Sequence, residues 1–168
     1  MSTIGPETLG RLFREHGPAL RLFARQWGPG ADDLVQEAFL TLVRQPRLPD
    51  PVRPWLYRVV RHRAIEAARA ARRRRGREAV AAPREAWFTA ADDQLDADDA
   101  TAALAELPVA LREIIVARLW GGLTFEEVAH LVGCSLTTAH RRYQQGLAEL
   151  RSRLEGPCPP HPISRSAT

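Results

Sequence analysis

Hydrophobic residues recur along this chain at intervals of three and four, the spacing of one face of an α-helix. No segment alternates apolar and polar residues with the period of two that marks a half-buried strand. The pattern predicts a first helix from about Glu7 to Gln26, a second from near Ala31, and a third that starts at Pro54 and runs into consecutive arginines. We therefore expect an all-α protein.

Glycine and proline mark the breaks between these helices. Gly28-Pro29-Gly30 predicts a turn, and the segment from Gln45 to Pro54 holds four prolines and predicts an extended loop. Pro54 is well placed as the first residue of a helix, where its missing N–H costs nothing. Gly17-Pro18 is a candidate kink in the first helix.

The C-terminal third predicts a helix-turn-helix. Apolar positions from Leu104 to Leu119 indicate a helix running into Trp120-Gly121-Gly122. Thr124 and Glu127 have the spacing of a capping box, and the short helix they open should end at Gly133. Ser135 then caps a longer amphipathic helix. Because paired helices with a glycine turn are common, this geometry alone leaves DNA binding and plain packing equally open.

The outward side of that last helix is the more informative feature. With the apolar row from Leu136 to Leu154 turned inward, six uncharged or cationic side chains point outward, and all can bond to bases or phosphates. They are Thr137, Thr138, Arg141, Arg142, Gln144 and Gln145.

Charge divides the 168 residues into blocks. All 24 cationic side chains are Arg, and residues 1–77 hold 16 of them against seven acidic residues. Residues 78–110 hold one Arg against eight acidic residues. We expect an N-terminal helical domain at 1–77, an acidic linker at 78–98, a helix-turn-helix domain at 99–155 and a disordered tail at 156–168. Trp87-Phe88 is unusual in a linker, and its role is open.

Two surfaces of the N-terminal block stand out. The helical period places Arg58, Arg61 and Arg72 on the outer face of the third helix. One acidic residue accompanies nine arginines between Arg58 and Arg77, which favours a phosphate-facing surface over an ordinary solvated face. On the second helix, Leu40 lies among polar residues on the outer side. A single exposed leucine carries little weight, so this side is either unremarkable or a partner-binding face.

Several classes of protein are not indicated. No apolar run has the length of a membrane span, and no signal peptide is evident, so we expect a soluble cytosolic protein. We expect no enzyme and no cofactor, because no catalytic constellation or phosphate-binding glycine loop is present. Cys134, His140, Cys158 and His161 are a weak zinc candidate, since Cys134 falls in a turn, and we expect no metal site.

Three motifs then follow one another in a distinctive order: Asp32-Asp33-Leu34-Val35-Gln36-Glu37-Ala38-Phe39, Pro54-Trp55-Leu56-Tyr57-Arg58-Val59-Val60-Arg61-His62, and Leu107-Pro108 through Leu154. In this order and separation they resemble a bacterial sigma factor of the extracytoplasmic-function (ECF) type. The likeness covers residues 8–155, about nine-tenths of the chain.

The resemblance implies three binding surfaces. The face of the second helix would dock on the clamp helices of the largest subunit of core RNA polymerase, through Asp33, Gln36, Glu37, Leu40 and Arg44. The third helix and the loop before it would hold the melted −10 promoter element, through Arg53, Arg58, Arg61, His62, Arg69 and Arg72. The six outward residues of the last helix would read the −35 element as duplex.

The resemblance also allows an anti-sigma factor as a partner, although no residue identifies one. Three positions depart from the family pattern. His62 stands where Asn is usual, Thr137-Thr138-Ala139-His140 replaces Gly-Thr-Val-Lys, and Gln145 stands where many relatives carry Arg. We therefore infer no promoter sequence. The alternatives are a stand-alone helix-turn-helix regulator and a sigma-like protein that sequesters a partner.

Overall fold

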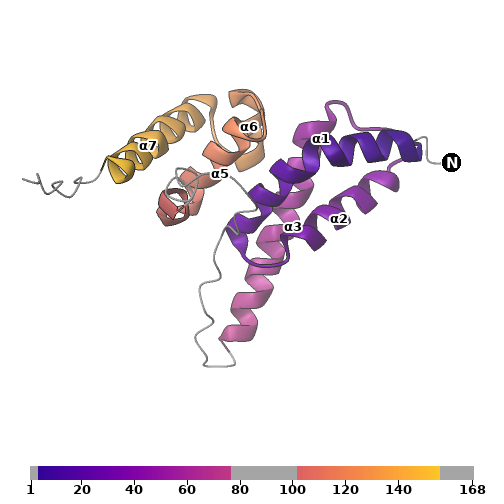
Figure 1. Cartoon of the computed structure of the whole chain (residues 1–168), viewed down its shortest axis with the longest axis horizontal. Coiled ribbons are helices and arrows are strands. Elements are labelled where there is room, and N and C mark those ends of the chain that lie inside the picture. Colours follow the sequence, from indigo (N-terminus) through magenta and orange to yellow (C-terminus); the bar gives the residue numbers. More distant parts are fainter. Residues whose placement is uncertain (1–3, 77–101, 156–168) are drawn as a thin grey trace, which may run out of the picture.

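The computed structural model describes residues 4–76 and 102–155, and every regular element within these ranges is a helix (Figure 1). Residues 4–76 form what we call the N-terminal half. Its helices are α1 (Pro6–Ala24), continued by the 3₁₀ turn η1 (Arg25–Trp27), then α2 (Ala31–Val43) and α3 (Val52–Arg75). The expected all-α class is confirmed.

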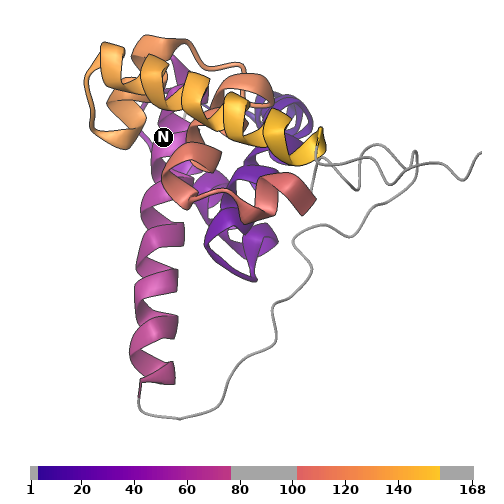
Figure 2. The ribbon, with the colours of Figure 1, turned by 90° about the vertical axis from the view of Figure 1, so that its left-hand side faces the viewer.

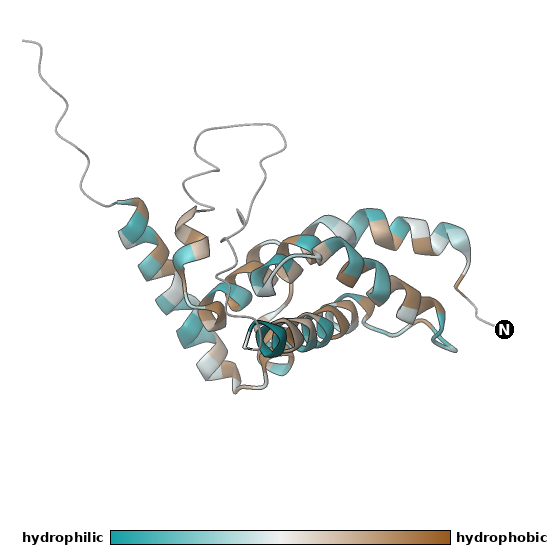
Figure 3. Cartoon of the chain, turned by 90° about the horizontal axis from the view of Figure 1, so that it is seen from below, coloured by the Kyte–Doolittle hydropathy of each residue, from teal (hydrophilic) through white to brown (hydrophobic). Residues whose placement is uncertain are grey.

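Residues 102–155 form the C-terminal half. Residues 102–106 are helical, and α5 (Val109–Leu119), α6 (Phe125–Val132) and α7 (Leu136–Leu154) follow. α6 and α7 are amphipathic, whereas the consecutive residues Leu111–Ala117 of α5 are all buried. Figure 3 shows the hydropathy of each residue along the helices. The predicted linker with Trp87-Phe88 and the predicted tail lie outside the described residues.

Two predicted helix boundaries were wrong. α3 begins at Val52 and not at Pro54, which shortens the preceding loop. The helix expected from Leu104 to Leu119 is broken, because Pro108 has an extended backbone with ψ of 138° and α5 starts after it. A proline disfavours helical geometry in the residue before it, so the chain turns at Leu107. Leu119, the last apolar position of that predicted helix, is 53% exposed.

The predicted caps of the helix-turn-helix are confirmed. The Thr124 hydroxyl accepts from the backbone N–H of Glu127 at 3.2 Å, and the Glu127 carboxylate accepts from the backbone N–H of Thr124 at 2.8 Å. Gly133 ends α6 with a φ of +72°, a conformation that favours glycine. Ser135 caps α7 by accepting from the backbone N–H of Thr138. These caps hold α7 at a fixed angle to α6.

α7 lies close against α5 at one glycine. A Cβ placed on Gly146 would lie 2.7 Å from Cδ1 of the buried Ile115, so only a residue without a side chain allows this approach. Ala139 is the fully buried contact one turn from the start of α7. The inner side of α7 is thereby fixed, and its outer side faces away from the protein.

The two halves pack directly on each other, which the expectation of two domains on a tether did not include. α5 contacts α1 and η1, and α6 contacts α3 (Figures 1 and 2). A single apolar cluster runs through both halves, from Leu20 and Phe23 of α1 through Tyr57 of α3 to Ile114 of α5 and Leu123. Burial on this scale is the main stabilising contribution to the fold.

Candidate nucleic-acid interface

The outer face of α2 is exposed along its whole length. It carries an acidic beginning, an apolar centre and a cationic end, with Leu40 at 56% exposure as the most exposed large apolar side chain among the described residues. Its five residues are Asp33, Gln36, Glu37, Leu40 and Arg44, all exposed. Glu37 has one partner from another helix, with its carboxylate 3.8 Å from Arg63 Nη1. The face is therefore a continuous surface available to a partner.

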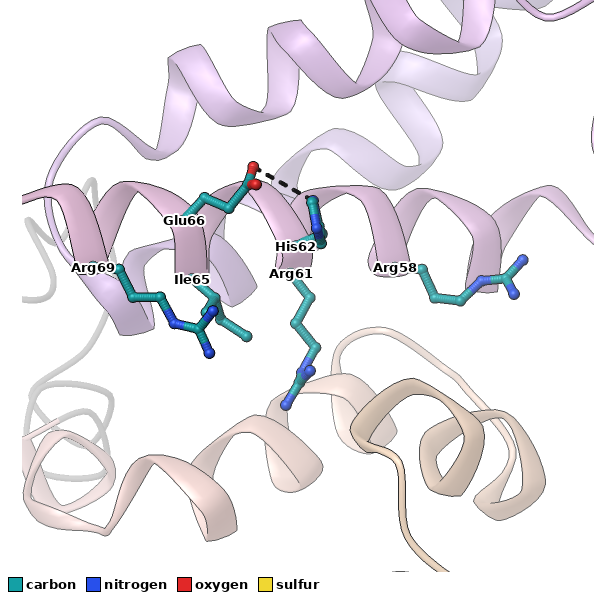
Figure 4. A pocket seen from close by; sticks show the side chains of 6 residues that line it. All are labelled: Arg58, Arg61, His62, Ile65, Glu66 and Arg69. Atoms are coloured by element: carbon teal, nitrogen blue, oxygen red, sulfur yellow. Dashed lines mark ion pairs between the residues drawn. The ribbon is translucent and has the colours of Figure 1, made fainter.

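α3 presents a cationic surface with an open pocket on it. The residues that line the pocket are Arg58, Arg61, His62, Ile65, Glu66 and Arg69 (Figure 4). His62 Nδ1 lies 3.5 Å from the Glu66 carboxylate, whereas Arg58, Arg69 and Arg72 are exposed. A row of exposed guanidinium groups of this kind suits a phosphate backbone.

Arg61 is one of two predicted −10 residues that bond to the C-terminal half. Its side chain leaves α3 toward the C-terminal half (Figure 4). There Nε donates to Glu113 Oε2 at 2.8 Å and Nη2 donates to Oε1 at 3.2 Å, so the pair is bidentate. The sequence pattern placed Arg61 on the free outer face, but the structure pairs it with α5 across 52 residues.

Arg53 is also engaged between the halves. Its Nη1 donates to the backbone oxygen of Gly122 at 3.2 Å, and its Nη2 lies 3.9 Å from the Glu15 carboxylate. The first turn of α3 is thus tied to the turn before α6. Arg53 retains partial exposure.

The two aromatic residues at the start of α3 have different positions. Tyr57 is buried, its ring meets Phe23 edge-on at 4.9 Å, and burial raises the pKa of its phenol. Trp55 is half-buried and packs on the core from its edge. Tyr57 is therefore a core residue, and only Trp55 keeps a ring surface near the exposed side of α3.

The outward side of α7 carries the six predicted side chains. Thr137, Arg141, Gln144 and Gln145 are exposed, and Thr138 and Arg142 are half-buried. Gln145 Nε2 donates to Glu149 Oε1 at 3.0 Å, which orients its amide. No acidic side chain interrupts the set before Glu149, so the surface can accept base edges or phosphates.

The sequence did not predict which residues pack against α7 and hold its outward side in place. The ring of Phe125 contacts both His140 and Tyr143 of α7, at 4.9 and 5.2 Å, and Arg118 lies over its other side at 5.0 Å. In the sequence, Phe125 was noted only as part of the capping box that begins at Thr124, with no contact to the last helix. Glu113 was also missed, because a buried acidic residue within an apolar helix has no local signal for a partner on α3.

No membrane-length apolar helix is found within residues 4–76 and 102–155, and no cluster of three or more His, Cys, Asp or Glu residues suited to a metal occurs there. Cys158 and His161 of the weak zinc candidate lie outside the described residues.

A three-helix unit with a cationic helix, followed by a helix-turn-helix with a polar outer side, is an arrangement typical of DNA-binding proteins. The family model described as ECF sigma factor matches residues 25–155. The chain belongs to the ECF sigma factor family, and the resemblance seen in the sequence is confirmed.

Named relatives agree with this assignment. The ECF RNA polymerase sigma factor SigD of Mycobacterium tuberculosis is 34% identical over 76% of this chain, and the match spans 64% of SigD. The RNA polymerase sigma factor CarQ of Myxococcus xanthus is 32% identical over 85% of this chain and 87% of its own length.

The fold is also similar to that of a solved sigma factor. RpoE from Bartonella quintana, in complex with the anti-sigma factor NepR, superposes with a TM-score of 0.74 over 92% of this chain and all of that chain, at 24% identity. This likeness concerns the fold, including the arrangement of the two halves.

Proposed function

We propose that this protein binds core RNA polymerase and directs transcription from promoters that it recognises at both the −35 and −10 elements. The observation that supports it most is membership of the ECF sigma factor family over residues 25–155. The protein would act by binding and positioning, not by catalysis. Because bacterial polymerase and promoters lie in the cytoplasm, this function requires the protein there.

The outer face of α2 is the proposed polymerase contact. Leu40 supplies an apolar centre, and the flanking Asp33, Gln36 and Glu37 give the polar rim that a specific interface needs. Arg44 adds an exposed cationic group at the C-terminal end of this face. We assign to this face the clamp helices of the largest polymerase subunit.

The exposed side of α3 is the proposed contact for melted −10 DNA. Arg58, Arg69 and Arg72 would track phosphates, while His62 and the exposed edge of Trp55 lie near the pocket where an unstacked base would sit. Arg53 and Arg61 would join this track when their present partners in the C-terminal half are released.

The outer side of α7 is the proposed reader of the −35 duplex. Its caps place Thr137 and Thr138 near the N-terminus of the helix, where backbone N–H groups favour a phosphate. Arg141 and Gln145, one turn apart, have the donors and acceptors for base edges in the major groove.

A protein of the anti-sigma class is a further proposed partner. Of two proteins with a similar fold, RpoE is described in complex with the anti-sigma factor NepR, and CnrH in complex with the cytosolic domain of CnrY. The fold shared with them supports a partner of the same class for this chain.

Run-off transcription with purified core polymerase tests the proposed function. We expect the protein to yield a new transcript from a promoter mapped after its overexpression. A stand-alone regulator or a sequestering protein would give none, and that result would reject the proposal.

The polymerase contact is tested by Leu40→Asp. A charged residue at the apolar centre should weaken core binding at least about tenfold, a loss of ~1.4 kcal/mol, and remove the transcript. Leu154→Asp, at a similarly exposed leucine near the end of α7, is the matched control. Pull-down of core polymerase measures both, and equal binding by the two variants would contradict the assignment to α2.

A further inference from the structure

The junction between the two halves uses a cationic side chain that the proposed function needs for DNA. Arg61 donates both of its hydrogen bonds to the carboxylate of Glu113. The Glu113 side chain is 7% exposed and that of Arg61 25%. The carboxylate is therefore shielded from water in this arrangement, while the guanidinium remains reachable from the pocket side of α3.

A carboxylate and a phosphate compete for the same groups of an arginine. Both bind an edge of the guanidinium through two parallel N–H···O bonds, and the Nε/Nη2 edge of Arg61 cannot bind a phosphate in this way while it is bonded to Glu113. Arg61 lies between Arg58 and Arg69 in the lining of the pocket. DNA bound along this row would thus meet an arginine already neutralised by Glu113.

Other polar groups at the junction indicate that it can open. Both polar atoms of the Gln26 side chain and the Tyr57 hydroxyl are buried and have no hydrogen-bond partner among the described residues. The Gln26 backbone oxygen accepts from Arg112 of α5, and the Tyr57 ring lies beside Gly121. A buried polar group without a hydrogen-bond partner is unfavourable, and separation of the halves would let these groups bond to water.

We propose that the Arg61–Glu113 pair is an intramolecular latch. It holds the halves together and withholds Arg61 from single-stranded DNA, and a DNA phosphate replaces Glu113 when the halves separate. This inference rests on the proposed contact between α3 and DNA. Separation of the halves and binding of single-stranded DNA are linked. If separation raises the affinity for DNA by a given factor, bound DNA raises the ratio of open to closed molecules by the same factor.

Glu113→Gln in the full chain is the main test. It preserves shape but removes the charge that binds Arg61. We expect a larger radius of gyration by small-angle X-ray scattering. We also expect tighter binding of a labelled single-stranded oligodeoxynucleotide, by about tenfold if roughly nine-tenths of the molecules are latched.

Glu106→Gln is the matched control. It removes one negative charge from an exposed ion pair with Arg153, within the C-terminal half. It therefore reproduces the change in net charge without touching the junction, and we expect neither expansion nor a comparable gain in affinity. Equal behaviour of the two variants would overturn the latch.

Arg61→Gln tests the pair from its more exposed side, so loss of folding is less of a concern. It should expand the molecule as Glu113→Gln does, but it should weaken binding of the oligodeoxynucleotide. A merely structural pair would shift both variants alike in DNA binding, and that outcome would also overturn the proposal.

Failure of the proposed function can be distinguished. If Glu113→Gln expands the molecule and tightens DNA binding while no variant supports run-off transcription, the latch stands and the sigma activity is rejected. If transcription occurs and the scattering of Glu113→Gln matches that of the unmodified chain, the latch is rejected and the sigma activity stands.

Discussion

His16 is a histidine held neutral by its surroundings. Its side chain is 8% exposed in α1, beside Glu15 and Arg53. Burial lowers its pKa below the ordinary 6.5 and Arg53 lowers it further, while Glu15 opposes them. Burial is the largest of the three effects, so the protonated form is disfavoured in the folded protein.

This environment predicts a pH dependence of stability. Below about pH 6.5 the unfolded chain binds a proton at His16 that the folded chain resists, so the free energy of unfolding should fall as the pH is lowered through this range and be fully retained above it. His16→Gln, which removes the titrating group, should flatten that dependence. Urea denaturation at about pH 7.5 and about pH 5.5 measures it. A steeper fall in His16→Gln would contradict the assignment.

At this scale the sequence predicts which side of a helix a residue occupies, but not what will be packed there. Leu40 was placed on the outer side of its helix and is exposed. Arg61 was placed outward by the same rule, yet α5 covers it and supplies Glu113. A helical period is local information, whereas an ion pair across 52 residues depends on how the halves meet.

One side of α7 packs on the C-terminal half, and the other side carries the residues proposed to bind DNA. Gly146 and Ala139 bring its inner side against the rest of the C-terminal half, and Phe125 supports it through Tyr143. The outer side makes few contacts within the protein, apart from the link between Gln145 and Glu149. Residues there can change without loss of the fold.

Arg141→Ala should therefore affect DNA recognition and not stability. If Arg141 contacts a base, the change should cost ~1–3 kcal/mol with the preferred −35 duplex and relax selectivity at one base pair. Arg151→Ala, exposed nearer the end of α7, should leave selectivity unchanged. Fluorescence anisotropy with duplexes varied singly across the −35 element checks both. Uniform weakening on all duplexes by Arg141→Ala would mean a phosphate contact.

Caps were the most predictable feature of the elements. The capping box at Thr124 and the left-handed Gly133 depend on residues within one turn, so the sequence alone predicts them. The break at Pro108 was missed because the apolar spacing continues from Leu104 to Leu111 across it. The period is shared by both helical pieces, and only the proline interrupts the backbone.

At the scale of the whole molecule, cationic charge is concentrated where α3 leaves the body of the protein. Figure 2 shows the C-terminal part of this helix extending away from all other helices. Arg72, Arg73, Arg74 and Arg75 occupy its last turn and are exposed. Such a projection binds polyanions through their charge and not their sequence.

Arg72→Ala should weaken DNA binding equally for all sequences. Each lost phosphate contact releases about one counterion fewer, so the slope of log K against log salt should become shallower by ~1. Arg11→Ala, exposed in the first half of α1, removes the same charge from a different helix and should leave the slope unchanged. Anisotropy across a salt series provides the measurement. A sequence-dependent loss would instead assign Arg72 to base recognition.

The division into a basic block and a helix-turn-helix could be predicted, because charge and the spacing of apolar residues are local properties of the sequence. The contact between the halves could not. Leu123 and Ile114 are apolar residues that would suit an isolated core equally well, and nothing local shows that Tyr57 of α3 joins them. The predicted domain limits at 77 and 99 stay predictions, because they fall outside the described residues.

Beyond Ala64, α3 has no buried side chain, although the helix continues for three more turns to Arg75. Neighbouring guanidinium groups repel one another there, opposed chiefly by the negative end of the peptide dipoles. The stability of these last turns therefore depends on the ions around them. Added multivalent anions would screen the repulsion between the guanidinium groups and stabilise the exposed end of α3.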